Sequence, residues 1–233
     1  MRELIVAIDG PSGAGKSTLS KLLARRLGYI NLDTGAMYRA VALAARRLQI
    51  DPEDNEALGR LASKLSIDFL RMDNGRERVL LDGEDVSEAI RAPEVSLLTS
   101  RVSACPAVRE AMVRRQRELG AEGGVVLEGR DIGSVVFPDA EVKFFLKATA
   151  EERGRRRYEE LKAKGTPITL QQTIANVEAR DAADSKRQYA PLLQADDAVA
   201  IDTTALCIEE VLSRMLSLVS ERRLAAGLPV REF

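Results

Sequence analysis

The feature that most constrains the fold is a glycine-rich segment that separates a short apolar run from a helical pattern. Residues Gly10-Pro-Ser-Gly-Ala-Gly-Lys-Ser17 match the phosphate-loop pattern G-x-x-x-x-G-K-[ST]. The apolar run Leu4–Ile8 before it predicts a strand buried on both faces, as in parallel sheets. The apolar residues of Lys16–Leu27 recur at helical spacing and predict a helix directly after the loop. This order of strand, glycine loop and helix is the context that a nucleotide-binding phosphate loop requires.

The residue types of this loop suit phosphate oxygens. Glycines at positions 10, 13 and 15 allow backbone N–H groups to turn inward, and the helix that follows adds the positive end of its dipole. We expect Lys16 to reach the β- and γ-phosphates and the Ser17 hydroxyl to bind Mg²⁺. The predicted ligand is therefore ATP or GTP with magnesium, and the predicted binding residues are Gly10, Pro11, Ser12, Gly13, Ala14, Gly15, Lys16, Ser17 and Thr18.

Later parts of the chain repeat the alternation of short apolar strands with helices. Strands are predicted at Tyr29–Leu32, Val125–Leu127, Val142–Leu146 and Ala198–Ile201, and a long helix at Cys207–Ala226. Such alternation favours a doubly wound α/β core with a parallel sheet. The polar stretch from Arg222 to Phe233 is expected to be loosely held.

Two stretches depart from this alternation. Strands at Ile67–Leu70 and Val79–Leu81, with turns at Asp73-Asn74-Gly75 and Asp82-Gly83, predict an antiparallel insert. Helices are expected on either side of it, over Asn55–Ser66 and Pro93–Ser103.

The second departure is Thr149–Arg187, which predicts a helical hairpin. The patterns Thr149-Ala-Glu-Glu152 and Thr169-Leu-Gln-Gln172 are capping boxes, and a turn is expected at Lys164-Gly165-Thr166-Pro167. The hairpin is rich in basic side chains, namely Arg153, Arg155, Arg156, Arg157, Lys162, Lys164, Arg180, Lys186 and Arg187.

Composition excludes several classes of chemistry. The chain has no histidine, which rules out a Ser-His-Asp triad and a histidine-ligated zinc site. Cys105 and Cys207 form no C-x-x-C pattern and are expected to be ordinary buried thiols. A net charge of −1 argues against general nucleic-acid binding, and no apolar run approaches the length of a membrane span. We expect a cytoplasmic protein, and without a coiled-coil heptad a monomer.

The distribution of arginines favours phosphoryl transfer over a nucleotide switch. Neither D-x-x-G nor N-K-x-D, the motifs of a GTPase, occurs in the sequence. The best candidate for a Walker B strand is Val125–Glu128. Arg153 and Arg157 are four residues apart on one predicted helix face, so both are candidates to contact a transferring phosphoryl group.

Several further motifs carry a resemblance to a known family. Ile8-Asp-Gly-Pro-Ser-Gly-Ala-Gly-Lys-Ser-Thr18, Asp33-Thr-Gly-Ala-Met-Tyr-Arg39, Glu128-Gly-Arg-Asp-Ile-Gly133 and Val135-Val-Phe-Pro-Asp139 occur in order. The similarity continues through Arg109-Glu-Ala-Met-Val-Arg-Arg-Gln-Arg117, Arg180-Asp181 and Arg187. Over nearly its whole length the chain therefore resembles the bacterial-type cytidylate kinases.

This resemblance implies transfer of a phosphoryl group from ATP, with Mg²⁺, to CMP or dCMP. It implies a P-loop fold of the nucleoside monophosphate kinase kind, with core segments at 1–38, 104–149 and 188–233, a monophosphate-binding insert at 39–103 and a helical lid at 150–187. Lys16, Arg153, Arg157 and Arg180 would be catalytic. The implied acceptor residues are Thr34, Tyr38, Arg39, Ser100, Arg109, Arg130, Asp131, Asp184 and Arg187.

Within that set the resemblance assigns roles. Arg39 and Arg130 would hold the acceptor phosphate, and Asp184 with Arg187 would lie at the sugar and phosphate end. Thr34, Ser100, Arg109 and Asp131 would face the cytosine. Cytosine carries an amino donor beside two acceptors, so a carboxylate such as Asp131 and a donor such as Arg109 suit it.

Two alternatives stay open on the residues alone. One is another small P-loop kinase that acts on a different monophosphate or on a hydroxyl, for which Asp33, Glu128 or Asp131 offers a base. The other is a nucleotide-gated ATPase or regulatory protein. A phosphate monoester dianion needs no general base as an acceptor, which agrees with the lack of histidine.

Overall fold

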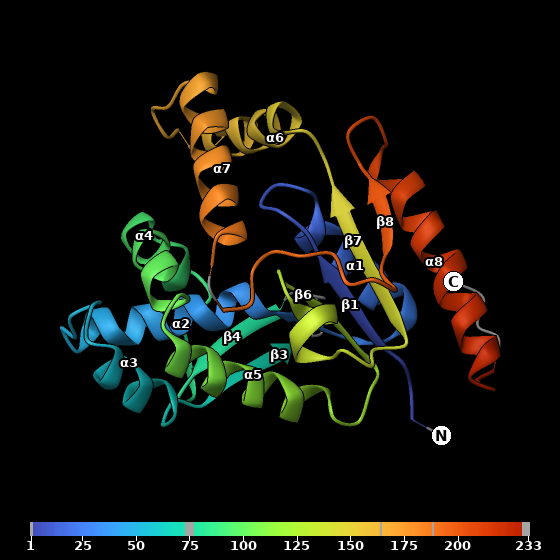
Figure 1. Ribbon diagram of the computed structural model, residues 1–233, viewed down its shortest axis with the longest axis horizontal. Helices are drawn as coiled ribbons and strands as arrows, with labels where there is room; N and C mark the ends of the chain where they lie inside the picture. The colour runs from blue at the N-terminus through green and yellow to red at the C-terminus, as the bar shows by residue number, and fades with distance from the viewer. Residues whose placement is uncertain (1, 73–76, 164, 188, 230–233) are drawn as a thin grey trace. The chain divides into compact units, whose positions relative to one another are not determined.

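The computed structural model describes residues 2–72, 77–163, 165–187 and 189–229 (Figure 1). The chain divides into two compact units. One consists of Met1–Asn31 together with Glu122–Phe233, and the other of Leu32–Ala121. The turn expected at Asp73-Asn74-Gly75 and residue 164 of the other expected turn lie outside the described residues.

A parallel sheet forms the centre of the first unit. Its five strands are β1 (Ile5–Asp9), β2 (Ile30–Asp33), β6 (Val125–Glu128), β7 (Val142–Lys147) and β8 (Val199–Asp202), in the spatial order β2-β6-β1-β7-β8. β1 pairs in parallel with β6 and with β7, and Ile8 lies opposite Glu128 and Phe144. The strand with the phosphate loop is therefore the central one, which confirms the predicted α/β core. The boundary between the two units falls within β2.

Helices cover one face of this sheet. α1 (Lys16–Leu27) and α8 (Ile208–Ala225) share a hydrophobic cluster with Val6 and Ile8 of β1 and with Leu4, which directly precedes this strand. Figure 1 shows both helices beside the strands. Period-two alternation along β1 accounts for this, because every second side chain points to the same face.

The predicted helical hairpin is present as α6 (Ala150–Ala163) and α7 (Leu170–Ser185), which pack on each other (Figure 1). The capping box at Thr169 and Gln172 is confirmed in both directions. The box at Thr149 is only half formed. Thr149 Oγ1 accepts from the Glu152 N–H at 3.3 Å, but the Thr149 N–H donates to Thr204. The Glu152 carboxylate is instead held by Arg155 and Arg156, which are stronger donors than a backbone amide.

The second unit has its own core. Its helices are α2 (Thr34–Arg47), α3 (Asn55–Ala62), a short 3₁₀ turn at Ala89–Arg91, α4 (Pro93–Val102) and α5 (Pro106–Gly120). Its antiparallel sheet consists of β3 (Ile67–Arg71), β4 (Glu77–Leu81) and β5 (Glu84–Asp85). The predicted turn at Asp82-Gly83 is confirmed, with φ of 50° and 84°, as a tight two-residue hairpin requires. Helix α3 ends at Ala62, before the predicted Ser66.

Two expectations about the chain's periphery are wrong. Arg223 is 1% exposed and Leu228 joins the core cluster, so the C-terminal stretch is held firmly as far as Leu228. The Arg223 guanidinium binds the Glu3 carboxylate and, at 2.8 Å, the Tyr29 hydroxyl, an anchor that linear patterning cannot reveal. Cys105 is buried as expected, but Cys207 is exposed at the N-terminus of α8. Within the described ranges, no helix has the length and apolar character needed to cross a membrane.

Candidate functional site

The phosphate loop begins directly at the carboxyl end of the central strand β1. Gly10, Gly13 and Gly15 have φ values of 144°, 79° and 91°, a region that side chains with a Cβ rarely adopt. Space is a second constraint at Gly10, where a Cβ would lie 2.3 Å from the carbonyl oxygen of Leu146. The loop ends at the N-terminus of α1, so its amides and the helix dipole form a ready site for anions.

Lys16 is the first residue of α1 and is buried within the loop. Its ammonium group donates a hydrogen bond to the carbonyl oxygen of Pro11 at 2.6 Å. Burial lowers the pKa of Lys16 well below its usual value, and the positive charges of Arg130 and Arg180 lower it further. Two of the predicted site arginines therefore lie within electrostatic range of this lysine. The carboxylates of Glu128 and Asp9 act in the opposite direction and raise this pKa, so the Lys16 ammonium group lies among charges of both signs.

Ser17 and Glu128 meet beside the loop. The Ser17 hydroxyl donates to Glu128 Oε2 at 2.7 Å, and Glu128 is buried at the end of β6, the strand that neighbours β1. Magnesium prefers oxygen ligands, usually one or two from the protein together with water and phosphate oxygens. A hydroxyl and a carboxylate side by side next to a phosphate site fit that preference.

Asp9 is the last residue of β1, and its carboxylate is occupied by backbone amides. Oδ1 accepts from the Ile132 N–H at 2.9 Å and Oδ2 from the Gly133 N–H at 2.7 Å. Burial raises the pKa of Asp9 to about 6, even though these two hydrogen bonds lower it. The negative charge of Asp131 also raises this pKa, so Asp131 lies close by.

The arginines of α6 have different surroundings. Arg153 is buried, and its guanidinium contacts the carbonyl oxygens of Ala148 and Ser12 and, at 2.5 Å, the Asp181 carboxylate on α7. Arg157 is half exposed and pairs with Glu160 at 2.8 Å. The two arginines were predicted to act together from one helix face. Instead, Arg153 binds the phosphate loop, whereas Arg157 lies at the surface of the hairpin.

A buried carboxylate clamps two further predicted arginines. Asp184 on α7 is 4% exposed, with Oδ2 at 2.8 Å from Arg130 Nε and Oδ1 at 2.6 Å from Arg187 Nη2. Three of the predicted acceptor residues are therefore in direct contact. Arg130 follows β6, so this clamp connects the end of the sheet with the end of the hairpin.

The second unit carries five of the six other predicted acceptor residues, whereas the buried Asp131 belongs to the first unit. Thr34 is buried at the first position of α2, and the preceding Asp33 caps that helix and pairs with Arg39 at 2.9 Å. The Arg109 guanidinium on α5 lies 5.6 Å from the centre of the Tyr38 ring, a cation–π contact. Ser100 is exposed on α4.

Sequence reasoning missed three positions that the geometry brings into the site. Asp9 looked only like the end of an apolar strand, and Asp181 only like part of a motif. Thr203, directly after β8, accepts from Arg156 and bonds the backbone oxygens of Ala14 and Lys147. Of these three, only Asp9 had a usable signal in the sequence, because it is an acid at the carboxyl end of a buried strand, as Glu128 also is.

The chain is similar to known proteins over nearly its whole length. The sequence model of the family described as "Cytidylate kinase" matches residues 6–221. A cytidylate kinase of Syntrophotalea carbinolica is 65% identical over 95% of this chain and 94% of its own length. The cytidylate kinase of Geobacter sulfurreducens is 62% identical over 96% of each chain, and that of Caldicellulosiruptor bescii 51% identical over 94% of this chain and 96% of its own.

Proposed function

Because this chain belongs to the cytidylate kinase family, we propose that it transfers the γ-phosphoryl group of ATP to CMP or dCMP, giving ADP and CDP or dCDP. The observation that carries the proposal is the positive charge around Lys16. Arg130 and Arg180 both lie within electrostatic range of its ammonium group, beside a phosphate loop. Arginines beside a phosphate loop suit phosphoryl transfer, because they can stabilise the charge on the transferring group.

ATP is proposed to bind through residues 10–18, with its phosphates on the loop amides and on Lys16. Ser17 and Glu128 would hold Mg²⁺, because their oxygens are already within hydrogen-bond distance of each other. The ion would supply charge neutralisation on the β- and γ-phosphate oxygens. Thr203 and Arg153 support the loop from behind through the backbone oxygens of Ala14 and Ser12.

The acceptor is proposed to bind through the residues that the family resemblance implies. Arg39 and Arg130 would contact its phosphate, while Asp184 and Arg187 would lie toward its sugar. Thr34, Ser100, Arg109 and Asp131 would recognise the cytosine, and Tyr38 would support Arg109 through its cation–π contact. The clamp of Asp184 on Arg130 and Arg187 supports this proposal, since it fixes both guanidinium groups before any ligand arrives.

Transfer in this site needs positioning and charge stabilisation rather than proton removal. The acceptor phosphate has a second pKa near 6, so at neutral pH it is mainly a dianion and already a nucleophile. Lys16 and Arg180 would stabilise charge on the transferring group, joined by Arg157 from α6. Arg153 would act through the loop, because its donors are bound to Ser12, Ala148 and Asp181. Closure of the helical hairpin over the site would exclude water.

The proposal also assigns a role to each segment of the chain and names its binding partners. Residues 1–38, 104–149 and 188–233 would form the core, 39–103 the monophosphate-binding insert and 150–187 the lid. ATP and CMP or dCMP would be the partners, bound by a cytoplasmic monomer without nucleic acid or membrane. The even balance of 35 basic and 36 acidic residues supports a small polyanionic partner over a nucleic acid.

A panel of acceptors tests the proposed function. ADP release is measured with Mg²⁺ and ATP, together with CMP, dCMP, UMP, AMP or no acceptor. The proposal requires turnover that depends on CMP or dCMP and exceeds that with UMP and AMP. Equal ADP release with and without an acceptor would instead establish an ATPase.

A further inference from the structure

A single carboxylate connects the strand of the phosphate loop with the segment that carries two of the proposed acceptor residues. Asp9 stands at the end of β1, one residue before the loop. Its two oxygens accept the N–H groups of Ile132 and Gly133, directly after Arg130 and Asp131. On the other side of these two residues, the Gly129 N–H donates to the Ile8 carbonyl oxygen at 3.0 Å. Residues 129–133 are thus held at both ends by the last two residues of β1.

The arrangement requires a carboxylate in this position. Both partners of Asp9 are donors, and only an ionised carboxyl offers two acceptor oxygens in one plane. The segment itself begins an unusual turn, a π-helical turn at Ile132–Val136, in which the Phe137 N–H bonds to the Ile132 carbonyl oxygen at 2.7 Å. Asp9 therefore satisfies the amides at the start of this turn, as a capping side chain does for an α-helix.

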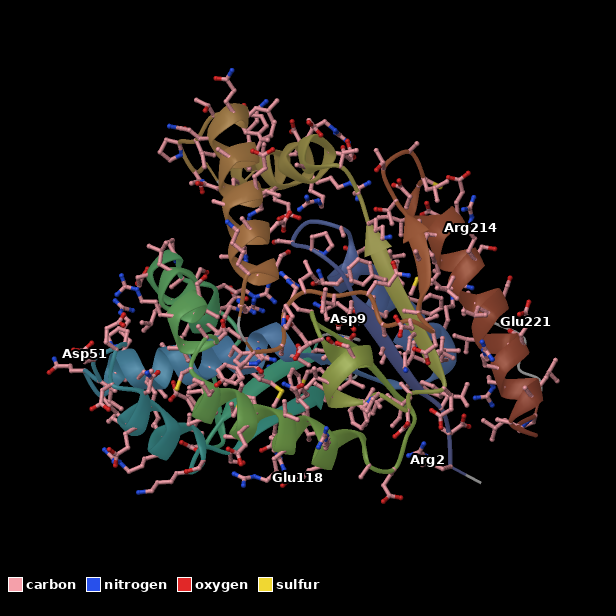
Figure 2. All side chains as sticks on the ribbon, viewed as in Figure 1. Arg2, Asp9, Asp51, Glu118, Arg214 and Glu221 are labelled. Carbon is pink, nitrogen blue, oxygen red and sulfur yellow. The ribbon has the colours of Figure 1, made fainter. Side chains whose placement is uncertain are left out.

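Packing leaves little freedom around this contact. Asp9 is 5% exposed, and Figure 2 shows it among the strands and connections of the first unit, while Arg214 and Glu221 point outward from α8. A Cβ on Gly133 would lie 3.5 Å from Asp9 Oδ2 and 3.1 Å from Cδ of Lys143. The Gly133 backbone therefore approaches Asp9 with the Lys143 side chain packed directly behind it.

We propose that Asp9 is a positioning residue for the acceptor: through Ile132 and Gly133 it fixes Arg130 and Asp131 for CMP. This inference rests on the proposed function, in which Arg130 contacts the acceptor phosphate and Asp131 the base. Asp9 itself contacts neither substrate in this account. Because it precedes Gly10, it also ties the acceptor segment to the strand from which the ATP-binding loop starts.

The test compares Asp9→Asn with the unaltered protein at pH 7.5. Asparagine keeps the size of the side chain but turns an NH₂ group toward one of the two backbone donors. We expect faster amide hydrogen exchange at Ile132 and Gly133. Calorimetric titration should show the Kd for CMP raised tenfold or more, equivalent to about 1.4 kcal/mol of binding free energy, and the Kd for ATP changed by less than about threefold. Equal weakening of both ligands, or an unchanged Kd for CMP, overturns the proposal.

Asp54→Asn is the matched control. Asp54 also caps a backbone amide, that of Ala57 at 2.9 Å, but it is exposed and remote from the proposed residues in sequence. This variant should leave both Kd values unchanged.

Gly133→Ala provides a second variant if Asp9→Asn does not fold. Its methyl group crowds Lys143 and the Asp9 carboxylate without removing a hydrogen-bonding group. It should weaken CMP more than ATP, and a selective loss of ATP would refute the positioning role. A wild-type protein that does not bind CMP would overturn the proposed function, and the exchange rates at Ile132 and Gly133 would then decide separately whether Asp9 fixes the segment.

Discussion

Replacing the buried carboxylate of Asp184 gives the sharpest test of how the site is held together. Asp184 is 4% exposed, and its partners Arg130 and Arg187 are 18% and 16% exposed, so solvent screens these ion pairs only weakly. Removing one partner of a buried pair leaves an uncompensated charge and costs about 3–5 kcal/mol. Asp184→Asn retains the shape and one acceptor oxygen, so we expect a loss of about 3 kcal/mol in the free energy of unfolding.

Glu152→Gln supplies the comparison. Glu152 also joins two arginines, Arg155 and Arg156, and it lies on the same helical hairpin. Arg155 is 58% exposed, however, and Arg156 keeps its bonds to Thr203. Exposed pairs contribute about 0.2–1 kcal/mol, so this variant should lose less than about 1 kcal/mol.

Urea unfolding of both variants, followed by circular dichroism at pH 7.5, measures the difference. The same protein samples give kcat/KM for CMP, which should fall for Asp184→Asn because Arg130 and Arg187 lose their orientation. Equal losses of unfolding free energy in the two variants would refute the reasoning, because burial would then not decide the strength of these pairs.

Three further predictions follow from the site. Arg157→Ala should lower kcat by about 10³-fold, as for arginines that stabilise a transferring phosphoryl group, while the half-exposed side chain leaves the unfolding free energy nearly unchanged; a near-normal kcat would contradict its role. Asp131→Ala should reduce the ratio of kcat/KM for CMP to that for UMP, and an unchanged ratio would place base recognition elsewhere. Burial raises the pKa of Asp9 from 3.8 to about 6, so between pH 4 and 6 the folded chain keeps a proton that the unfolded chain has released. Wild-type unfolding free energy should therefore fall by about 3 kcal/mol relative to Asp9→Asn as pH rises through this window, and pH-independent differences in urea unfolding would exclude the shift.

The local parts of the fold were predictable because their signals lie within a few residues. The phosphate loop, the strands around it and the capping box at Thr169 all follow from spacing and residue type. The Asp82-Gly83 turn was predictable for the same reason, since both residues tolerate positive φ. The prediction of a capping box at Thr149 was only half right, because the Thr149 N–H donates to Thr204, which is distant in sequence.

Contacts between segments that are far apart in the sequence could not be predicted from it. Arg223 is separated from Glu3 by 220 residues, and their pairing holds a C-terminal stretch that polarity marked as loose. Arg153 was predicted to share a helix face and a role with Arg157, yet it is buried against Ser12 and Asp181. Asp9 and Glu128 are an intermediate case, in which the proximity of two distant residues could be predicted from the sequence. Acids at the carboxyl ends of neighbouring buried strands in a parallel sheet are brought together by topology, and the sheet order β6-β1 does so here.

The fate of the γ-phosphorus tests the central claim most directly. The protein is incubated with γ-labelled ATP, Mg²⁺ and CMP, and the labelled products are separated by chromatography, with Lys16→Ala as the control. The account predicts that the label appears in CDP at the rate at which ADP forms, and that Lys16→Ala transfers none. Label released as inorganic phosphate, or transfer that survives in Lys16→Ala, would contradict the account.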